Sequence, residues 1–223
     1  MERIMTVREA FAKIKLRLNK SDSADFDMLW GYVMAEGLNK AITDSVRRMK
    51  RGKNQTQEGD EETNTRVDDL QVLLKIEPSV TFRDKGLYIQ TNSLPTDYLY
   101  YKRLTPTVSK GNCSNVIIQS HLREEANVDA LRTFPSFDFE ETFHTLIGNK
   151  AHVYHNKDFK VEKVSLTYYR KPKVYSHKKL DTKIEFKEDD CELFIEEACK
   201  IIASDIESLN QKTLAQERRE NND

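Results

Sequence analysis

Three histidines stand close enough in the sequence to raise the question of a zinc site. His144, His152 and His155 are spaced by eight and three residues, with Cys113 further upstream. The spacing of eight and then three residues matches no closed zinc motif. In a strand, His152 and His155 would point to opposite faces because their separation is odd. We therefore expect ordinary strand and loop histidines, with no bound metal and no cofactor.

A nucleophilic serine or cysteine would be the other common source of chemistry. The sequence has no Gly-x-Ser-x-Gly elbow and neither of the Gly-rich phosphate-binding patterns. Glycine makes up 7 of the 223 residues, which argues against the enzyme classes built on such loops. Catalytic triads assemble in space, so a small hydrolase or transferase stays an alternative. The favoured expectation is a protein that is not an enzyme and has no catalytic residues.

The charge balance excludes a chain that is drawn as a whole to nucleic acid or to an anionic membrane. Basic residues number 36 and acidic residues 37, a formal net charge of −1.

Three widely spaced cysteines, an odd number, favour a reducing, cytosol-like compartment. The N-terminus lacks the apolar core of a signal peptide, and no apolar run reaches the ~18 residues of a spanning helix. We expect a protein that is made and kept in a cytosol-like compartment and has no membrane partner.

Local charge is far from balanced near the C-terminus. Residues 157–187 hold ten Lys and Arg against four Asp and Glu, a net of +6, while residues 188–209 hold eight acids against one lysine, a net of −7. Neighbouring blocks of opposite sign suit contacts between subunits. Cations interleaved with rings also suit single-stranded nucleic acid, and the interleaved rings are Tyr168, Tyr169, Tyr175 and His177. The residues expected to face DNA or a neighbouring subunit are Arg170, Lys171, Lys173, Lys178 and Lys179.

The N-terminal third has the periodicity of long helices. Thr6 and Glu9 have the spacing of a capping box, which predicts a first helix over residues 7–19. Apolar residues at three- and four-residue steps predict a second helix from a cap at Asp22 or Ser23 to about Arg51. One stripe of this helix fits either a partner helix or packing within the chain: Phe26, Trp30, Val33 and Met34.

A polar segment separates these helices from the next element. Residues 51–65 contain no aliphatic or aromatic side chain, so burial cannot offset their ordering entropy and we predict a mobile loop. A short helix from Val67 to about Lys75 is predicted to follow. Near the C-terminus, acids crowd the first turn of a helix predicted to begin at Glu188, where the helix dipole favours negative charge.

Between the helical regions the sequence changes to short β-like runs divided by turn residues. Residues 80–82 and 87–90 predict a hairpin with Gly86 at a positive-φ position, and 98–102 and 116–120 predict further strands. The clearest hairpin is predicted to join residues 151–155 to residues 159–169. In its second arm the apolar positions Val164, Leu166 and Tyr168 alternate with Ser165, Thr167 and Tyr169, which predicts one buried and one wet face.

These elements predict an α+β fold, in which long N-terminal helices and a C-terminal helix pack beside a sandwich- or barrel-like antiparallel β domain. The helical region is expected over 1–77 and the β domain over 78–187. The C-terminal helix is expected over 188–210, packed on the helical region, and 211–223 forms a polar tail that frays.

Short motifs carry a resemblance to a known family. Arg66-Val67-Asp68-Asp69-Leu70-Gln71 follows the polar loop, and Leu94-Pro95-Thr96-Asp97-Tyr98 opens a β run. A later strand ends as Tyr168-Tyr169-Arg170-Lys171-Pro172, and Ile184-Glu185-Phe186-Lys187-Glu188 begins the last helix with acids. Over about residues 66–210, this arrangement resembles the neck proteins of tailed bacteriophages. It is most similar to the ring or head-to-tail connector proteins of crAss-like phages with short tails.

The resemblance implies a structural virion protein without catalytic residues. Proteins of this type form rings of twelve copies beneath the portal, connect it to the tail and line the channel through which DNA leaves. The implied partners are further copies of the chain, the portal, neighbouring neck or tail proteins and, non-specifically, the passing double-stranded DNA. Blocks of opposite charge would let one patch meet a different patch of the neighbour, a contact that closes into a ring. A nucleic-acid-binding accessory protein is the main alternative.

Overall fold

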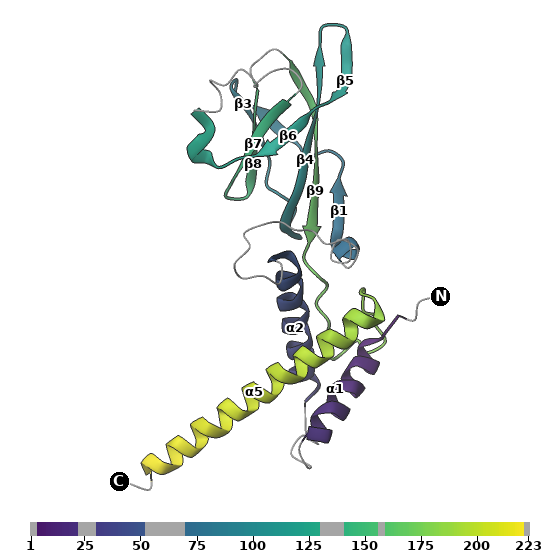
Figure 1. The fold of residues 1–223 in the computed structure, drawn as a ribbon, viewed down its shortest axis with the longest axis vertical. Helices are drawn as coiled ribbons and strands as arrows, with labels where there is room; N and C mark the ends of the chain where they lie inside the picture. The colour runs from purple at the N-terminus through teal and green to yellow at the C-terminus, as the bar shows by residue number, and fades with distance from the viewer. Residues whose placement is uncertain (1–3, 22–29, 52–69, 130–140, 156–158, 221–223) are drawn as a thin grey trace. The chain divides into compact units, whose positions relative to one another are not determined.

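The computed structural model describes residues 4–21, 30–51, 70–129, 141–155 and 159–220. Its chain divides into a helical unit, Met1–Val72 with Pro172–Asp223, and a strand unit, Leu73–Lys171. Helices and mainly antiparallel sheets make an α+β fold, as predicted (Figure 1). The predicted loop over 51–65 lies outside the described residues from residue 52 on.

In the part of the helical unit that the structure describes, the α-helices are α1 (Val7–Ser21), α2 (Gly31–Arg51) and α5 (Glu188–Glu220). The predicted capping box is present at the start of α1, because the Glu9 N–H donates to Thr6 Oγ1 and the Thr6 N–H donates to the Glu9 carboxylate. α5 starts at Glu188 as predicted, but it stays helical to Glu220 through residues expected to fray. α5 packs on both α1 and α2.

α2 begins later than the sequence pattern predicts. Its first residue is Gly31, and Trp30 lies before the helix, with Phe26 outside the described residues. The Trp30 carbonyl accepts the N–H groups of Val33 and Met34, so Trp30 sits where an N-cap residue would. Further along, the apolar stripe is buried as expected at Met34, Ala35, Leu38, Ala41, Ile42 and Val46.

α2 and α5 approach each other closely at a glycine. A Cβ added at Gly37 would lie 2.7 Å from Ile202 Cγ1 and 2.9 Å from its Cδ1, and Ile202 is 1% exposed. Further along α2, Arg48 pairs with Glu197 of α5 at 2.9 Å. Rising numbers on α2 thus meet falling numbers on α5, so the two helices run antiparallel.

The segment 172–187, expected in the β domain, belongs to the helical unit. The Ile184 N–H donates to the Met5 carbonyl at 2.9 Å, and the Val7 N–H donates to the Thr182 carbonyl at 2.9 Å. These backbone bonds join the segment to the start of α1. The strand unit therefore ends at Lys171 and not at residue 187.

The described residues of the strand unit form two sheets, with strand orders β1-β9-β4-β5 and β2-β3-β8-β7-β6. The strands are β1 (Leu74–Glu77), β2 (Phe82–Asp84), β3 (Tyr88–Thr91), β4 (Tyr98–Lys110), β5 (Cys113–Ile117), β6 (Gln119–Leu122), β7 (Glu141–Ile147), β8 (Lys150–Tyr154) and β9 (Lys160–Arg170). Among the described pairings, β6 with β7 is parallel and the others are antiparallel. The predicted turn between β2 and β3 is confirmed, with Gly86 at φ 89°.

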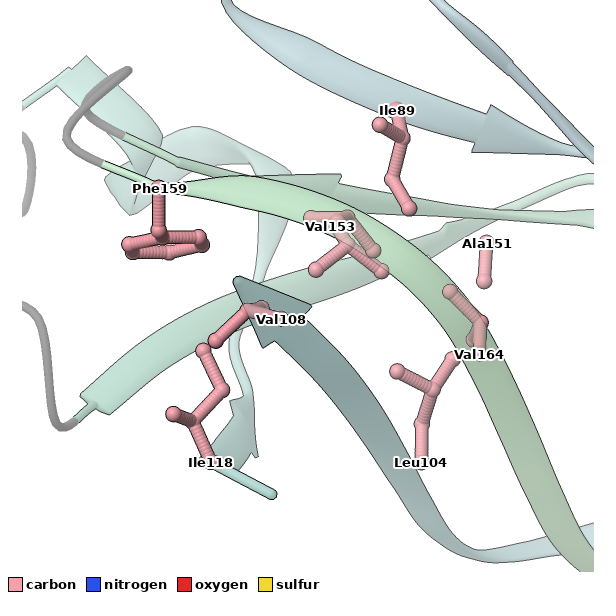
Figure 2. Close-up of a cluster of buried hydrophobic side chains, with 9 residues drawn as sticks. Ile89, Leu104, Val108, Ile118, Ala151, Val153, Phe159 and Val164 are labelled. Carbon is pink, nitrogen blue, oxygen red and sulfur yellow. The ribbon is translucent and has the colours of Figure 1, made fainter. Parts of the chain in front are cut away.

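Both sheets contribute side chains to one core (Figure 2). Together the sheets form a curled half-barrel. Its buried residues are Ile89, Leu104, Val108, Ile118, Ala151, Val153, Phe159, Val161 and Val164. Ile118 links the sheets, because it stands between β5 and β6 and its N–H donates to the Pro106 carbonyl of β4. The Val80 N–H likewise donates to the Val164 carbonyl at 2.8 Å.

Two strand predictions are wrong for reasons of long-range pairing. The expected hairpin of 151–155 with 159–169 does not form: β8 pairs with β3 and β7, and β9 pairs with β1 and β4. The expected helix to Lys75 gives way to β1 from Leu74 on, because pairing with β9 overrides local propensity there.

The burial of β9 follows its place between two neighbours in the sheet. Val164, Leu166 and Tyr168 are fully buried, as predicted. The face expected to be wet is different, since Thr167 and Tyr169 are buried as well.

Replacing Gly37 by Ala should destabilise the helical unit. A new Cβ overlaps a buried, β-branched side chain, and overpacking of this kind costs about 1–3 kcal/mol. The higher helix propensity of Ala returns at most about 1 kcal/mol. Urea unfolding followed by circular dichroism should show the loss, and Ile202→Ala added to Gly37→Ala should cost less than the two single losses combined. The exposed Lys40→Ala serves as a control; equal stability of Gly37→Ala and wild type would contradict the close approach.

Candidate functional site

The five basic residues expected to meet DNA or a neighbour are divided between the two units. Arg170 and Lys171 end the strand unit, whereas Lys173, Lys178 and Lys179 belong to the helical unit. Lys171 Nζ donates to a main-chain carbonyl at 3.3 Å, and the Lys173 ammonium lies 3.7 Å from a glutamate. Lys178 and Lys179 are exposed, so of this set they are the clearest candidates for meeting a partner.

The tyrosines interleaved with the basic block are not open to base stacking. Tyr168 is fully buried, and Tyr169 and Tyr175 are each 3% exposed. His177 is the exposed ring of the four. Because stacking requires an open ring face, this burial leaves His177 as the ring of the four that could stack on a base.

Asn39 fastens the segment that carries Lys178 and Lys179 to α2. Its Nδ2 donates to the Tyr175 carbonyl at 2.8 Å, and the Tyr175 N–H donates to its Oδ1 at 2.8 Å. A Cβ placed on Gly31 would lie 3.2 Å from the His177 Cβ. His177 and the lysines that follow it therefore start from a point beside the first turn of α2.

The predicted partner stripe on the second helix is only partly exposed. Trp30 is 67% exposed, Val33 is half-buried and Met34 lies in the core. Tyr32, which the stripe did not include, is 55% exposed, and its ring centroid lies 6.5 Å from that of Trp30. We call the exposed group at this end of α2 the aromatic–basic patch: Trp30, Tyr32, His177, Lys178 and Lys179.

Two acids of the block in α5, Glu192 and Glu197, are paired within the helical unit. Glu192 accepts hydrogen bonds from Lys13 and Arg17 of α1, and Glu197 pairs with Arg48 of α2. The bond from Lys13, outweighing partial desolvation, lowers the pKa of Glu192. The net −7 of the block therefore overstates the negative charge that a neighbouring subunit would meet.

One face of α5 keeps exposed acids around an exposed leucine. Asp189, Leu193 and Glu196 follow one another at four and three residues and so share a helix face. Leu193 is 57% exposed, and the Glu196 side chain is also 57% exposed, with Arg17 at 3.8 Å. We call Asp189, Leu193 and Glu196 the acidic face.

Two motifs behind the family resemblance meet in the strand unit. Asp97, in the Leu-Pro-Thr-Asp-Tyr turn, accepts hydrogen bonds from the Tyr168 hydroxyl at 2.8 Å and from Lys75 Nζ at 2.9 Å. Its carbonyl accepts the Lys171 N–H at 2.7 Å, at the Arg-Lys-Pro strand end. The turn before β4 is thereby tied to the end of β9. We call Lys75, Asp97 and Tyr168 the Asp97 joint.

The protonation states of the Asp97 joint support its hydrogen bonds. Partial burial raises the pKa of the Asp97 carboxyl, but the bonds from Lys75 and Tyr168 outweigh it and leave that pKa below its usual value. Burial and then the bond to Asp97 raise the pKa of the Tyr168 hydroxyl. At neutral pH the carboxylate accepts and the hydroxyl donates, which is the stronger, charge-assisted arrangement.

A serine and a histidine also come together, which the sequence did not indicate. Ser120 Oγ of β6 lies 2.7 Å from His144 Nδ1 of β7. His144 is fully buried, and its Nε2 has no hydrogen-bond partner among the described residues. Burial first, and then the nearby His121, lower the pKa of His144 to about 4, so the ring is neutral at pH 7. A Ser–His pair is an element of nucleophilic catalysis, but here the buried ring also ties β6 to β7.

The other histidines have separate surroundings. His152 bonds to Gln90 at 2.9 Å and stacks on Tyr88, and His155 is buried. Over the part of the chain that the structure describes, no three His, Cys, Asp or Glu side chains converge as a metal-binding group. No described helix has both the length and the apolar character that a bilayer crossing requires.

Tyr168→Phe should loosen the end of β9. It removes one hydrogen bond to a carboxylate that is partly exposed, and we expect a loss of about 1 kcal/mol in unfolding free energy. Hydrogen exchange should rise at residues 166–171. The control Tyr98→Phe removes a hydroxyl from the neighbouring ring and leaves the Asp97 bonds in place. Unchanged exchange in Tyr168→Phe would show that the joint does not hold this strand end.

Burial of His144 should make the protein less stable in acid. Its folded pKa of about 4 lies below the unfolded value near 6.5. Stability that is fully present above pH ~6.5 is therefore lost as the pH falls toward 4, by about 2–3 kcal/mol at pH ~4.5. Urea unfolding at several pH values should show a shallower pH dependence for His144→Gln, while the exposed His177→Gln should follow wild type. Parallel curves for His144→Gln and wild type would contradict this.

Neither a protein-family model nor a curated protein sequence matches this chain. The residues themselves must therefore carry any functional conclusion. The features that they offer are the aromatic–basic patch, the acidic face and the Asp97 joint.

Proposed function

We propose that this chain is a structural subunit of a tailed-phage neck, which assembles into a ring between portal and tail and lines the DNA exit channel. The observation that carries the proposal is the exposure of large apolar side chains on the helical unit. Trp30, Tyr32 and Leu193 are more than half exposed, and Val174 is 84% exposed. Only 38% of the residues are hydrophobic, so large apolar side chains that stay exposed are better explained by a contact with another protein. Trp and Tyr are also the residues that most often dominate protein–protein contacts.

The resemblance to phage neck proteins supplies the kind of assembly. The Asp97 joint supports that resemblance in one respect. The Leu-Pro-Thr-Asp-Tyr turn and the Arg-Lys-Pro strand end, two motifs on which the resemblance depends, are joined by hydrogen bonds to Asp97. Under this proposal the protein is not an enzyme, and its partners are its own copies, the portal and neighbouring neck or tail proteins. Its location is the virion, after assembly in the host cytoplasm.

The two alternatives rest on weaker observations. Binding of single-stranded nucleic acid would need open rings, and three of the four rings interleaved with the basic block, Tyr168, Tyr169 and Tyr175, are buried. The open rings beside Lys178 and Lys179 are those of the aromatic–basic patch. A small hydrolase would rest on the pair Ser120 and His144. A neutral imidazole beside a serine hydroxyl favours it, whereas the complete burial of that imidazole favours a structural role.

Self-assembly of the purified full chain tests the proposed function. We expect a particle with a mass near twelve times the 26.0 kDa of the chain, measured by mass photometry or light scattering. Negative-stain class averages should show closed rings with a central channel. Ser120→Ala should leave assembly unchanged, which separates the proposal from a hydrolase. A wild-type chain that stays monomeric at every concentration, with or without portal particles, would refute the ring.

A further inference from the structure

We propose that the aromatic–basic patch of one copy binds the acidic face of α5 on the next copy, in a head-to-tail contact. This inference rests on the proposed function, because it names the surfaces that would close the ring. Its occupant is therefore a second copy of this chain. Both surfaces belong to the helical unit, so the contact needs no particular placement of the strand unit.

The two surfaces match in chemistry. On the patch, Trp30 at 67% and Tyr32 at 55% exposure offer apolar rings beside the exposed Lys178 and Lys179. On the acidic face, Leu193 at 57% exposure stands between two exposed acids. An apolar centre with charges of opposite sign at the rim is the usual anatomy of a specific contact.

The charged groups on the acidic face are largely exposed to solvent, unlike the other acids of α5 that pair with α1 and α2. Glu192 and Glu197 are paired with α1 and α2, as described above, whereas Asp189 and Glu196 face solvent. Glu196 keeps a long contact of 3.8 Å to Arg17. The face continues to Lys200, whose ammonium lies 3.7 Å from Glu197. Lys200 thus follows the acids Asp189 and Glu196 on this face and ends that run of negative charge.

The two surfaces occupy different regions of the unit, which makes the contact heterologous. α2 and α5 run antiparallel, with Gly37 against Ile202 and Arg48 against Glu197. The start of α2, with Trp30, thus lies toward later turns of α5, whereas Asp189 and Leu193 lie in its first two turns. Two different surfaces on each copy propagate a ring or a chain rather than a closed dimer.

Charge reversal on each surface, followed by mixing, tests this contact. One variant carries Lys178→Glu and Lys179→Glu, and the other carries Asp189→Lys and Glu196→Lys. Each alone would juxtapose like charges, and we expect its apparent self-association constant to fall about tenfold or more at low salt, with a smaller effect near 1 M salt. An equimolar mixture should restore assembly, because every contact between unlike variants again pairs opposite charges.

Two controls make the result specific. Lys160→Glu with Lys163→Glu makes the same change in net charge on exposed residues of the strand unit and should assemble like wild type. Trp30→Ala should weaken association at low and high salt alike, whereas Ile117→Ala, which truncates a residue 71% exposed on the strand unit, should not. Thermal unfolding of each variant shows that it is folded, and recovery in the mixture shows this independently.

The outcomes separate this inference from the proposed function. Rings that form equally in wild type and in both charge variants would overturn the contact and leave the ring in place. Variants that associate only as a mixture, but into short chains without closure, would support the contact and refute the ring. Monomers throughout would refute both. Normal assembly with loss of DNA retention in Lys178→Glu with Lys179→Glu would assign the lysines to DNA and overturn the contact.

Discussion

The helical unit depends on contact between the two ends of the chain. Lys13 and Glu192, 179 positions apart, bond to each other, and Cys199 Sγ lies 3.8 Å from the Ile14 carbonyl. α1 is 15 residues long and α2 is 21, and both pack against α5. Short helices in isolation are marginal in water, so packing of α5 is what makes the unit stable. Such distant contacts also predict slow folding for the unit, because the chain between them must first be closed into a loop.

Local signals predicted the features that depend on neighbouring residues. The capping box at Thr6, the start of α5 at Glu188 and the turn at Gly86 each depend on a few side chains or one backbone angle, and each is found. Features that depend on distant pairing were wrong. A four-residue segment such as Leu74–Glu77 carries too little propensity to oppose pairing with β9, and sequence proximity suggested a β8–β9 hairpin that the shared core of two sheets does not contain.

The candidate surfaces were predictable in composition but not in geometry. The +6 and −7 blocks are plain in the sequence, yet nothing in it says that Glu192 and Glu197 bond to α1 and α2 or that Tyr168 and Tyr175 are buried. Tyr32 was missed because it does not share the helical spacing of Phe26, Trp30 and Val33. The predicted helix included Trp30, but α2 begins one residue later, at Gly31. Ser120 and His144 are 24 positions apart, and a parallel pair of strands brings them together.

The pairing of β1 with β9 places the two ends of the strand unit next to each other, as in domains that can be inserted into or exchanged within a host protein. Leu74 stands opposite Tyr169, so the chain enters and leaves this unit on adjacent strands, about 5 Å apart. An inserted unit with neighbouring ends can be exchanged without pulling its host apart, since a short linker spans the gap. The helical unit can therefore keep its fold while the strand unit between Val72 and Pro172 diverges, shrinks or is replaced. Under the proposed assembly, this chain would evolve slowly where copies meet and more freely in the inserted strand unit.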